Sequence, residues 1–428
     1  MGHLGNMKQE YRALQRRHDQ GPAGAPASEL LFEALRILYT EDEARLAAVM
    51  PWKPVSARHM ARRLGESEQD VRAKLDRMAE KGVVFDLVDP SSGKTRYVLA
   101  PPVVGFVEFS MMRVRDDIDQ KRIAQIWDSY LTTDRSFADA VFGVANGQLG
   151  RTLVHEDAVA EADDFCEVLD YEKASALIEE AGGGALSLCH CRHTGEHVGK
   201  PCTHRVDNCT SLLPAADYVI RRGYGRRAEV SELKEVLAQA REAGLVQIAD
   251  NVQRRPSYIC HCCGCHCGQL LAISRFGLKQ AVHTSSRIAH VDPEQCTACG
   301  ACVDRCPIAA LKLGDAQHTQ VDETLCLGCG VCNAACPSGA LTFPARTERV
   351  LTPETTIERI LLRAVDAGSV HHVLFGSEDN LTMTFLHRVL GVIERMPPTR
   401  ALLLNRQLKS KFVGWLLGEG RRQTRGAI

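Results

Sequence analysis

The first quarter of the chain has a regular pattern of apolar and polar positions. Apolar residues recur every three or four positions in residues 27–39 and 56–65, which predicts two amphipathic helices. A third helix is predicted over residues 67–82, with Ser67 as its N-cap. Residues 83–102 alternate apolar and polar side chains around a Pro-Ser-Ser-Gly turn. This alternation predicts two strands of a hairpin.

The order helix, helix-turn-helix and hairpin resembles a winged-helix domain, which would span residues 29–104. The resemblance implies DNA binding through the second helix of the motif. That helix carries as many acidic as basic side chains: Arg72, Lys74, Arg77 and Lys81 against Glu68, Asp70, Asp76 and Glu80. Such a balance complements phosphate poorly. We therefore expect this domain to dock protein, with DNA binding as the alternative.

The rest of the chain divides by composition. We expect residues 1–28 to be a frayed helix and linker, because they are charged and then rich in Gly, Pro and Ala. We expect a helical region at 105–185, a Cys- and His-rich segment with one helix at 186–270, a duplicated motif at 286–345 and a helical C-terminal region at 346–428. A peripheral membrane contact is the alternative to a packed helix at 407–422. The predicted fold class is α+β multidomain.

Composition and charge exclude several classes of protein. Of the 428 residues, 45% are hydrophobic and 25% charged, which excludes disordered and collagen-like chains. The net charge of −1 gives no overall attraction to DNA or anionic lipid. The N-terminus lacks the apolar core of a signal peptide, and no run reaches the roughly 18 apolar residues of a membrane span. We expect a soluble, cytoplasmic protein.

The cysteines change this ordinary picture. Seventeen of the 18 lie between Cys189 and Cys336, and the other, Cys166, lies in an apolar-periodic stretch where we expect a buried core thiol. Cysteines in runs such as Cys-His-Cys are too close along the chain to pair as disulfides. Their density indicates soft-metal or iron–sulfur ligation, in surroundings such as those of an anaerobic cell where thiolates survive.

Within this region the pattern CxxCxxCxxxCP occurs twice. Its cysteines are Cys296, Cys299, Cys302 and Cys306 in the first copy, and Cys326, Cys329, Cys332 and Cys336 in the second. A tight loop can present three thiolates to one cubane, and the small residues between them admit positive φ. Zinc knuckles are the disfavoured alternative. The flanking sequences predict short strands that enter and leave each loop.

The duplication resembles bacterial-type dicluster ferredoxins over residues 286–345. The resemblance implies two [4Fe-4S] clusters, in which the fourth cysteine of each copy crosses to the cluster of the other copy. One cluster would take Cys296, Cys299, Cys302 and Cys336. The other would take Cys326, Cys329, Cys332 and Cys306.

A further block of cysteines precedes the motif: Cys189, Cys191, Cys202 and Cys209, then Cys260, Cys262, Cys263, Cys265 and Cys267. Residues two apart in an extended strand point the same way, so each Cys-x-Cys can offer two thiolates to one metal body. Three interpretations stay open. They are one or two further [4Fe-4S] clusters (one per group or with shared ligands), structural zinc sites, and a single unusual cluster with a histidine ligand, for which His266 is the candidate. We favour iron–sulfur clusters. The block also loosely resembles a segment that precedes ferredoxin modules in long iron–sulfur proteins of anaerobic bacteria, where winged-helix-like front ends occur too.

No motif for a nucleotide or a flavin accompanies these cysteines. The pattern therefore favours an electron-transfer protein that exchanges electrons with a partner oxidoreductase. One alternative is a redox-sensing transcription regulator that uses the winged helix. The other is an oxidoreductase with its chemistry at the Cys/His block.

Overall fold

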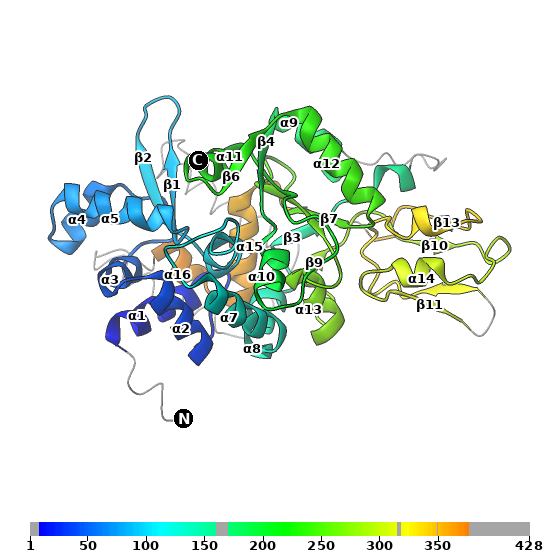
Figure 1. The fold of residues 1–428 in the computed structure, drawn as a ribbon, viewed down its shortest axis with the longest axis horizontal. Coiled ribbons are helices and arrows are strands. Elements are labelled where there is room, and N and C mark those ends of the chain that lie inside the picture. Colours follow the sequence, from blue (N-terminus) through cyan, green and yellow to red (C-terminus); the bar gives the residue numbers. More distant parts are fainter. Residues whose placement is uncertain (1–7, 160–169, 315–317, 349, 376–428) are drawn as a thin grey trace. The chain divides into compact units, whose positions relative to one another are not determined.

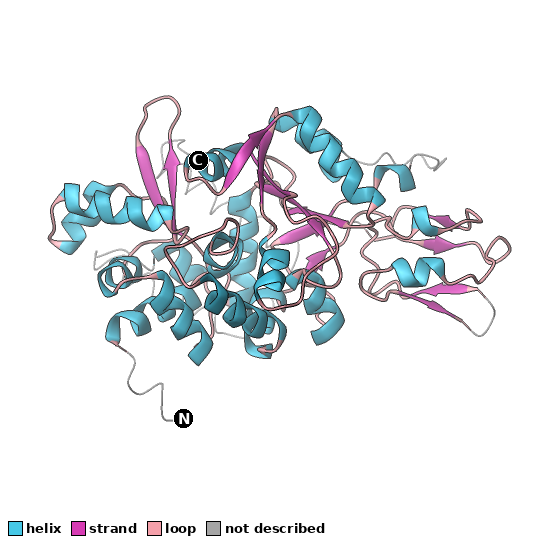
Figure 2. Cartoon of the chain, in the orientation of Figure 1, coloured by secondary structure: helices cyan, strands magenta, loops and turns pink. Residues whose placement is uncertain are grey.

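The computed structural model describes residues 8–159, 170–314, 318–348 and 350–375. The chain forms two compact units, and both helices and β-strands are present, which confirms the α+β class (Figures 1 and 2). The first unit contains residues up to 110, 144–147 and those from 353; the second contains 111–143 and 148–352. Cys166 and most of the expected C-terminal helical region, including 407–422, lie outside the described residues. Within the described ranges, no helix combines the length and the apolar character needed to cross a membrane.

The N-terminal segment of the first unit contains the helix expected in residues 1–28, but this helix is packed against the fold and is not frayed. It forms helix α1 (Gln9–Asp19), which is followed by α2 (Glu29–Leu38) and α3 (Glu41–Ala48). The Leu14 side chain is fully buried, and the Tyr11 hydroxyl donates a 2.9 Å hydrogen bond to the Tyr39 carbonyl. The polar composition of this segment hid the few apolar residues that anchor the helix.

The helices and hairpin predicted for residues 56–102 are present. They are α4 (Ala57–Leu64), α5 (Glu68–Glu80), β1 (Val84–Val88) and β2 (Thr95–Leu99). Gly65 ends α4 with a φ of 70°, a conformation that favours glycine. The Ser67 hydroxyl caps α5 by accepting from the Asp70 N–H. The strands pair antiparallel, with Val84 opposite Leu99.

Four short elements complete the described part of this unit: the turn η2 (Pro102–Phe106), α6 (Val107–Phe109), α15 (Thr356–Ala367) and α16 (Val370–Phe375). Arg363 of α15 is buried, and its guanidinium donates hydrogen bonds to the carbonyls of Pro22 (2.6 Å) and Ala23 (3.4 Å). This contact connects two segments that are more than 300 residues apart in the sequence.

The second unit is built on a seven-stranded sheet with the order β6-β4-β5-β8-β7-β3-β9. All neighbouring strands pair antiparallel except β3 and β9. The strands are β3 (Gly150–Thr152), β4 (Gly184–Ser187), β5 (Cys209–Leu212), β6 (Gly225–Ala228), β7 (Val246–Asp250), β8 (Tyr258–Cys262) and β9 (Val282–His283). Residues 105–185, expected to be helical, contain helices, among them α6, but also β3 and the start of β4.

The helices of this unit are α7 (Gln120–Thr132), α8 (Arg135–Phe142), α9 (Ala174–Ala181), α10 (His190–His197), α11 (Leu213–Arg221), α12 (Val230–Glu242) and α13 (Gly268–Phe276), with short turns η3 (Glu156–Ala158) and η4 (Asp170–Glu172). Helices α9 and α12 cover one face of the sheet (Figure 1). Their Leu177 and Leu233 pack in one core with Leu186 of β4, Leu212 of β5 and Ile259 of β8.

The duplicated-motif module (residues 286–345) forms two small antiparallel ladders. Strand β10 (His290–Val291) pairs with β13 (Leu341–Thr342), and β11 (Leu311–Leu313) pairs with β12 (Thr319–Val321). These four strands lie where the flanking sequences predict them. Helix α14 (Ala301–Arg305) contains Cys302, the third cysteine of the first copy, and the turn η5 (Asn333–Ala335) follows Cys332, the third cysteine of the second copy. The module is tied to the sheet by His155, whose N–H donates to the Cys329 carbonyl at 2.9 Å and whose Nε2 donates to the Leu245 carbonyl at 3.0 Å.

The core over β8 sets the stability of the thiol-bearing sheet. We expect Ile259→Ala to lower the free energy of unfolding of this unit by about 2–5 kcal/mol, because the side chain is fully buried and its loss leaves a cavity. Urea denaturation under anaerobic conditions, followed by far-ultraviolet circular dichroism, measures the change. Val114→Ala is the control, since this side chain is 79% exposed. Equal effects of the two substitutions would contradict the packing of β8 in that core.

Candidate metal centres

The two loops of the duplicated-motif module use the backbone freedom that the sequence predicted. Gly300, Gly328 and Gly330 have φ values of 78°, 70° and 80°. A Cβ at Gly328 would lie 1.9 Å from the Arg287 carbonyl oxygen, and one at Gly330 would lie 2.9 Å from the Cβ of Ala158. Both positions in the second loop therefore require glycine for conformation and for space.

Four thiols of this module line one cavity, and we call them the inner set: Cys306, Cys326, Cys329 and Cys332. Three of them come from the second copy of the motif, and Cys306 comes from the first. Apolar side chains, among them Ile308, Val331 and Phe343, line the same cavity. The geometry thus brings together the four cysteines that the resemblance to ferredoxins groups on one cluster.

Burial makes the inner set unfavourable as free thiolates. It raises the pKa of the Cys329 thiol to about 12, and the charges of Cys326 and Cys306 act in the same direction. Burial also raises the pKa of Cys306. Four thiolates can share this cavity only with positive charge between them, which the iron of a cubane would supply. The residues present therefore fit a [4Fe-4S] cluster.

The outer set comprises Cys296, Cys299, Cys302 and Cys336 and is more open. Cys299 is exposed, whereas Cys302 is buried and lies 3.4 Å from the Thr319 hydroxyl. Backbone N–H groups of Thr319 and Ala298 point to the Cys296 sulfur and lower the pKa of that thiol. Such donors favour the thiolate that binds iron. The charge of Cys336 also acts on Cys296, as a shared site requires.

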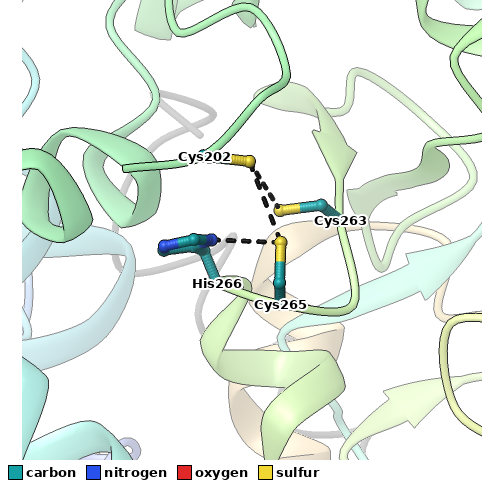
Figure 3. A group of neighbouring side chains, drawn as sticks. All are labelled: Cys202, Cys263, Cys265 and His266. Atoms are coloured by element: carbon teal, nitrogen blue, oxygen red, sulfur yellow. Dashed lines mark hydrogen bonds between the residues drawn. The ribbon is translucent and has the colours of Figure 1, made fainter. Parts of the chain in front are cut away.

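The preceding cysteines fall into two further sets, and their division differs from the sequence order. Cys202, Cys263, Cys265 and His266 form the Cys3His set, in which the candidate ligand atoms all lie within 4.8 Å of one another (Figure 3). The six-thiol set contains Cys189, Cys191, Cys209, Cys260, Cys262 and Cys267. One site per sequence group is therefore not what the structure shows. The alternative with ligands shared between the groups describes it.

Strand geometry explains this division. In β8, Ile259 faces the core under α9 and α12, so Cys260 and Cys262 point to the opposite face. The register Thr210 opposite Ile259, continued by one residue, places Cys209 opposite Cys260, and their sulfurs are 4.0 Å apart. Cys263 follows Cys262 directly and belongs to the other set.

Two helix starts complete the six-thiol set. Cys189 and Cys267 are the N-cap residues of α10 and α13. A hydrogen bond from Cys191 is the main cause that lowers the pKa of Cys189 to about 6. Hydrogen bonds from Cys191 and Cys262 lower the pKa of Cys267, with further help from the N–H groups of Leu270 and Gln269 in α13. The set can therefore hold thiolates and protonated thiols side by side.

A buried cation accompanies these thiols, and the sequence pattern had not singled it out. Arg192 is fully buried in α10, and its guanidinium donates to the Arg205 and His261 carbonyls (both 2.5 Å) and to Asn208 Oδ1 (2.9 Å). Burial opposes its charge, but the thiolates, Cys189 first, raise the pKa of Arg192. An arginine directly after a Cys-His-Cys triplet was the available signal.

Three further histidines of the block, His190, His193 and His197, make hydrogen bonds. His193 Nδ1 donates to the Met111 carbonyl at 2.7 Å, and the Nε2 atoms of His193 and His197 are 3.2 Å apart. His190 Nε2 lies 3.1 Å from the Cys191 sulfur. Of these histidines, only His266 belongs to the group whose ligand atoms converge.

A second cavity opens between the six-thiol and Cys3His sets. Its lining includes Cys191 of the six-thiol set and the neighbouring His190, together with Cys265 and His266 of the Cys3His set. Lys200 also lines it, and its ammonium group pairs with Asp128 at 2.7 Å. One cavity is therefore lined by residues of both sets.

Residues 295–340 match the sequence model of the 4Fe-4S dicluster domain family. No curated protein and no solved structure matches the chain. With the two sets of four thiols, the match shows that the chain carries an iron–sulfur module of ferredoxin type. The module supports a role in electron transfer.

The crossed arrangement of the two sets predicts how cysteine substitutions combine. We expect Cys306→Ala to remove about four iron atoms per chain, because it removes one ligand of the inner cluster. Cys306→Ala with Cys329→Ala should lose the same four, whereas Cys306→Ala with Cys299→Ala should lose about eight. Iron and acid-labile sulfide analysis after anaerobic purification measures these losses.

The control for these variants is Ser338→Ala, which changes a neighbour of Cys336 without removing a thiol. It should keep the full iron content. If Cys306→Ala and Cys299→Ala instead lost the same four iron atoms when combined, Cys306 would belong to the cluster of its own loop.

Proposed function

We propose that this chain is a multi-cluster iron–sulfur protein that passes electrons to or from a partner oxidoreductase. The observation that carries the proposal is the pair of crossed thiol sets, which suits two [4Fe-4S] clusters held by shared loops. Bound clusters of this type supply one-electron transfer. Apolar side chains shield the inner set from water, whereas Cys299 leaves the outer set open to solvent.

The exposure of the two sets gives the proposed path a direction. Cys299 of the outer set is exposed, which offers a redox partner an approach to that cluster. The inner set is enclosed by apolar side chains. Beyond it, Pro307, the residue after Cys306, lies against Gly264 between Cys263 and Cys265. The path therefore leads from solvent through the outer and inner sets toward the Cys-rich segment.

The six-thiol set is the proposed end of this path inside the chain. Six thiols exceed the four ligands of a single tetrahedral ion, so the set suits a centre with several metal ions. A further iron–sulfur cluster fits this need, since it would use four of the thiols and the protein would tune it with Arg192. A binuclear zinc centre is the alternative.

Metal analysis distinguishes these centres. We expect about 12 iron atoms per anaerobically purified chain, and a loss of about four in Cys260→Ser with the iron of the ferredoxin-type module retained. Electron paramagnetic resonance of the dithionite-reduced protein should show the matching loss of one signal. Cys166→Ser, at the cysteine outside all motifs, is the control and should lose nothing. If the wild type instead holds about eight iron atoms, and Cys260→Ser loses two zinc ions, the six-thiol set is a binuclear zinc centre.

A second candidate function is an oxidoreductase with its chemistry at the Cys/His block. The cavity beside Cys191 and His190 favours it, because a small substrate there would reach the six-thiol centre. Cyanide added to the reduced protein separates the two functions. The signal to follow is the electron paramagnetic resonance signal that is lost in Cys260→Ser. If cyanide changes this signal, the six-thiol centre binds small molecules, which favours an enzyme. If the signal stays unchanged, a protein that only transfers electrons is favoured.

Residues 29–104 are proposed to be a winged-helix-like domain that docks protein. In the structure, basic side chains of α5 are already paired with acidic neighbours. Lys74 contacts Asp42 (2.7 Å) and Glu66 (2.6 Å), and Arg72 contacts Glu68 (3.0 Å). Exposed pairs of this kind contribute little stability, but they reduce the positive field that phosphate binding requires.

A regulator that reads DNA is the alternative for this domain, and a binding titration tests it. We expect weak binding to genomic fragments at low salt, without sequence preference, in both the oxidised and the reduced protein. Arg72→Ala with Arg77→Ala should change it less than tenfold. Selective nanomolar binding that the double variant abolishes, or that follows the redox state, would establish the regulator.

A further inference from the structure

The Cys3His set has the dimensions of a site for one metal ion. The Cys202 sulfur lies 3.8 Å from the sulfur of Cys263 and 3.8 Å from that of Cys265 (Figure 3). Two thiolates bound at about 2.3 Å to one tetrahedral ion lie about 3.8 Å apart. Thiolates of a cubane lie farther apart, because each of the four irons carries one of them. The sulfur positions therefore match a single ion.

The ferredoxin-type module provides a comparison within the same chain. Among its eight described cysteines, no thiol hydrogen-bonds to another thiol; their side-chain partners are hydroxyl groups, as for Cys302 with Thr319 and Cys336 with Ser338. The thiols of the inner set act on one another through charge alone. The thiols of the ferredoxin-type module are thus more widely spaced than those of the Cys3His set.

The orientation of His266 supports ligation by its Nδ1 atom. Its Nε2 lies 2.7 Å from the Lys200 carbonyl, which can only accept a hydrogen bond, so Nε2 carries the proton. The lone pair of the neutral ring is then on Nδ1, which lies 3.1 Å from the Cys265 sulfur. Metal-binding histidines are commonly held in this way by a carbonyl on the other ring nitrogen.

We propose that Cys202, Cys263, Cys265 and His266 bind one structural zinc ion. Three thiolates and one imidazole around a tetrahedral ion are a standard donor set for structural zinc. The site joins the loop after α10, which supplies Cys202, to the connection between β8 and α13, which supplies the other three ligands. It goes beyond the proposed electron transfer, because zinc has no redox chemistry.

The zinc ion would fix the point where the Cys-rich segment meets the ferredoxin-type module. Gly264 lies between two of the ligands, and a Cβ there would lie 2.5 Å from the Pro307 carbonyl oxygen. Cys262 and Cys267, on either side of the ligands in the sequence, belong to the six-thiol set. One ion therefore holds in place the segments that carry two neighbouring centres.

X-ray absorption at the zinc edge of the full-length wild-type protein tests the proposal. We expect one zinc per chain, with three sulfur ligands at about 2.3 Å and one nitrogen at about 2.0 Å. In Cys265→Ser the zinc content should fall at least fivefold, while the iron of the ferredoxin-type module stays unchanged. His266→Cys should keep zinc as a four-sulfur site, and His197→Ala is the matched control that keeps the wild-type site.

Other outcomes would overturn the zinc site and leave the electron-transfer proposal to be judged by iron content. A wild-type protein without zinc, in which Cys265→Ser loses about four iron atoms, would place a cubane here. Loss of a single iron atom would place a mononuclear iron site here. If Cys265→Ser fails to fold, the zinc-edge spectrum of the wild type still decides.

Discussion

Repulsion among thiolates is the constraint on which the second unit depends. Seventeen cysteines converge on four sets, and burial raises the pKa of several of them, as for Cys329 at about 12. Arg192 is a buried cation beside the six-thiol set that balances part of this charge. Metal ions are therefore part of the electrostatic balance of this unit as well as its chemistry.

The two faces of the sheet separate the apolar core from the thiols. One face of β8 contributes Ile259 to the core under α9 and α12, and the other contributes Cys260 and Cys262. The apolar core packs against the strands β5 and β8, whose register brings Cys209 opposite Cys260. The geometry of the thiols is thus a consequence of ordinary hydrophobic packing.

The sequence predicted the features that depend on local spacing. Helices α4 and α5, the hairpin and the short strands of the ferredoxin-type module lie where the pattern of residues places them. The seven-stranded sheet was missed because its strands are only two to five residues long, too short for a clear pattern of apolar and polar positions. The helix expected in residues 1–28 is present as α1, but its packing was not predicted, because few of its residues are apolar.

The membership of the thiol sets shows the same limit. Spacing within the duplicated motif, together with the resemblance to ferredoxins, grouped Cys306 with Cys326, Cys329 and Cys332, and these four line one cavity. No local spacing shows that Cys202 joins Cys263, or that Cys209 joins Cys260. Those groupings follow from a loop path and a strand register, which are long-range properties of the fold.

The hydrogen bonds of Arg192 have a consequence for the order of assembly. Its guanidinium joins α10, the loop that carries Arg205 and Asn208, and β8, through three acceptors supplied by the chain. All three contacts are hydrogen bonds within the polypeptide, so we expect the newly made chain to shape part of this cage before metal binds. Cofactor delivery would then be an insertion into a prepared cage, with small movements of side chains, in contrast to small zinc domains that fold only around their ion.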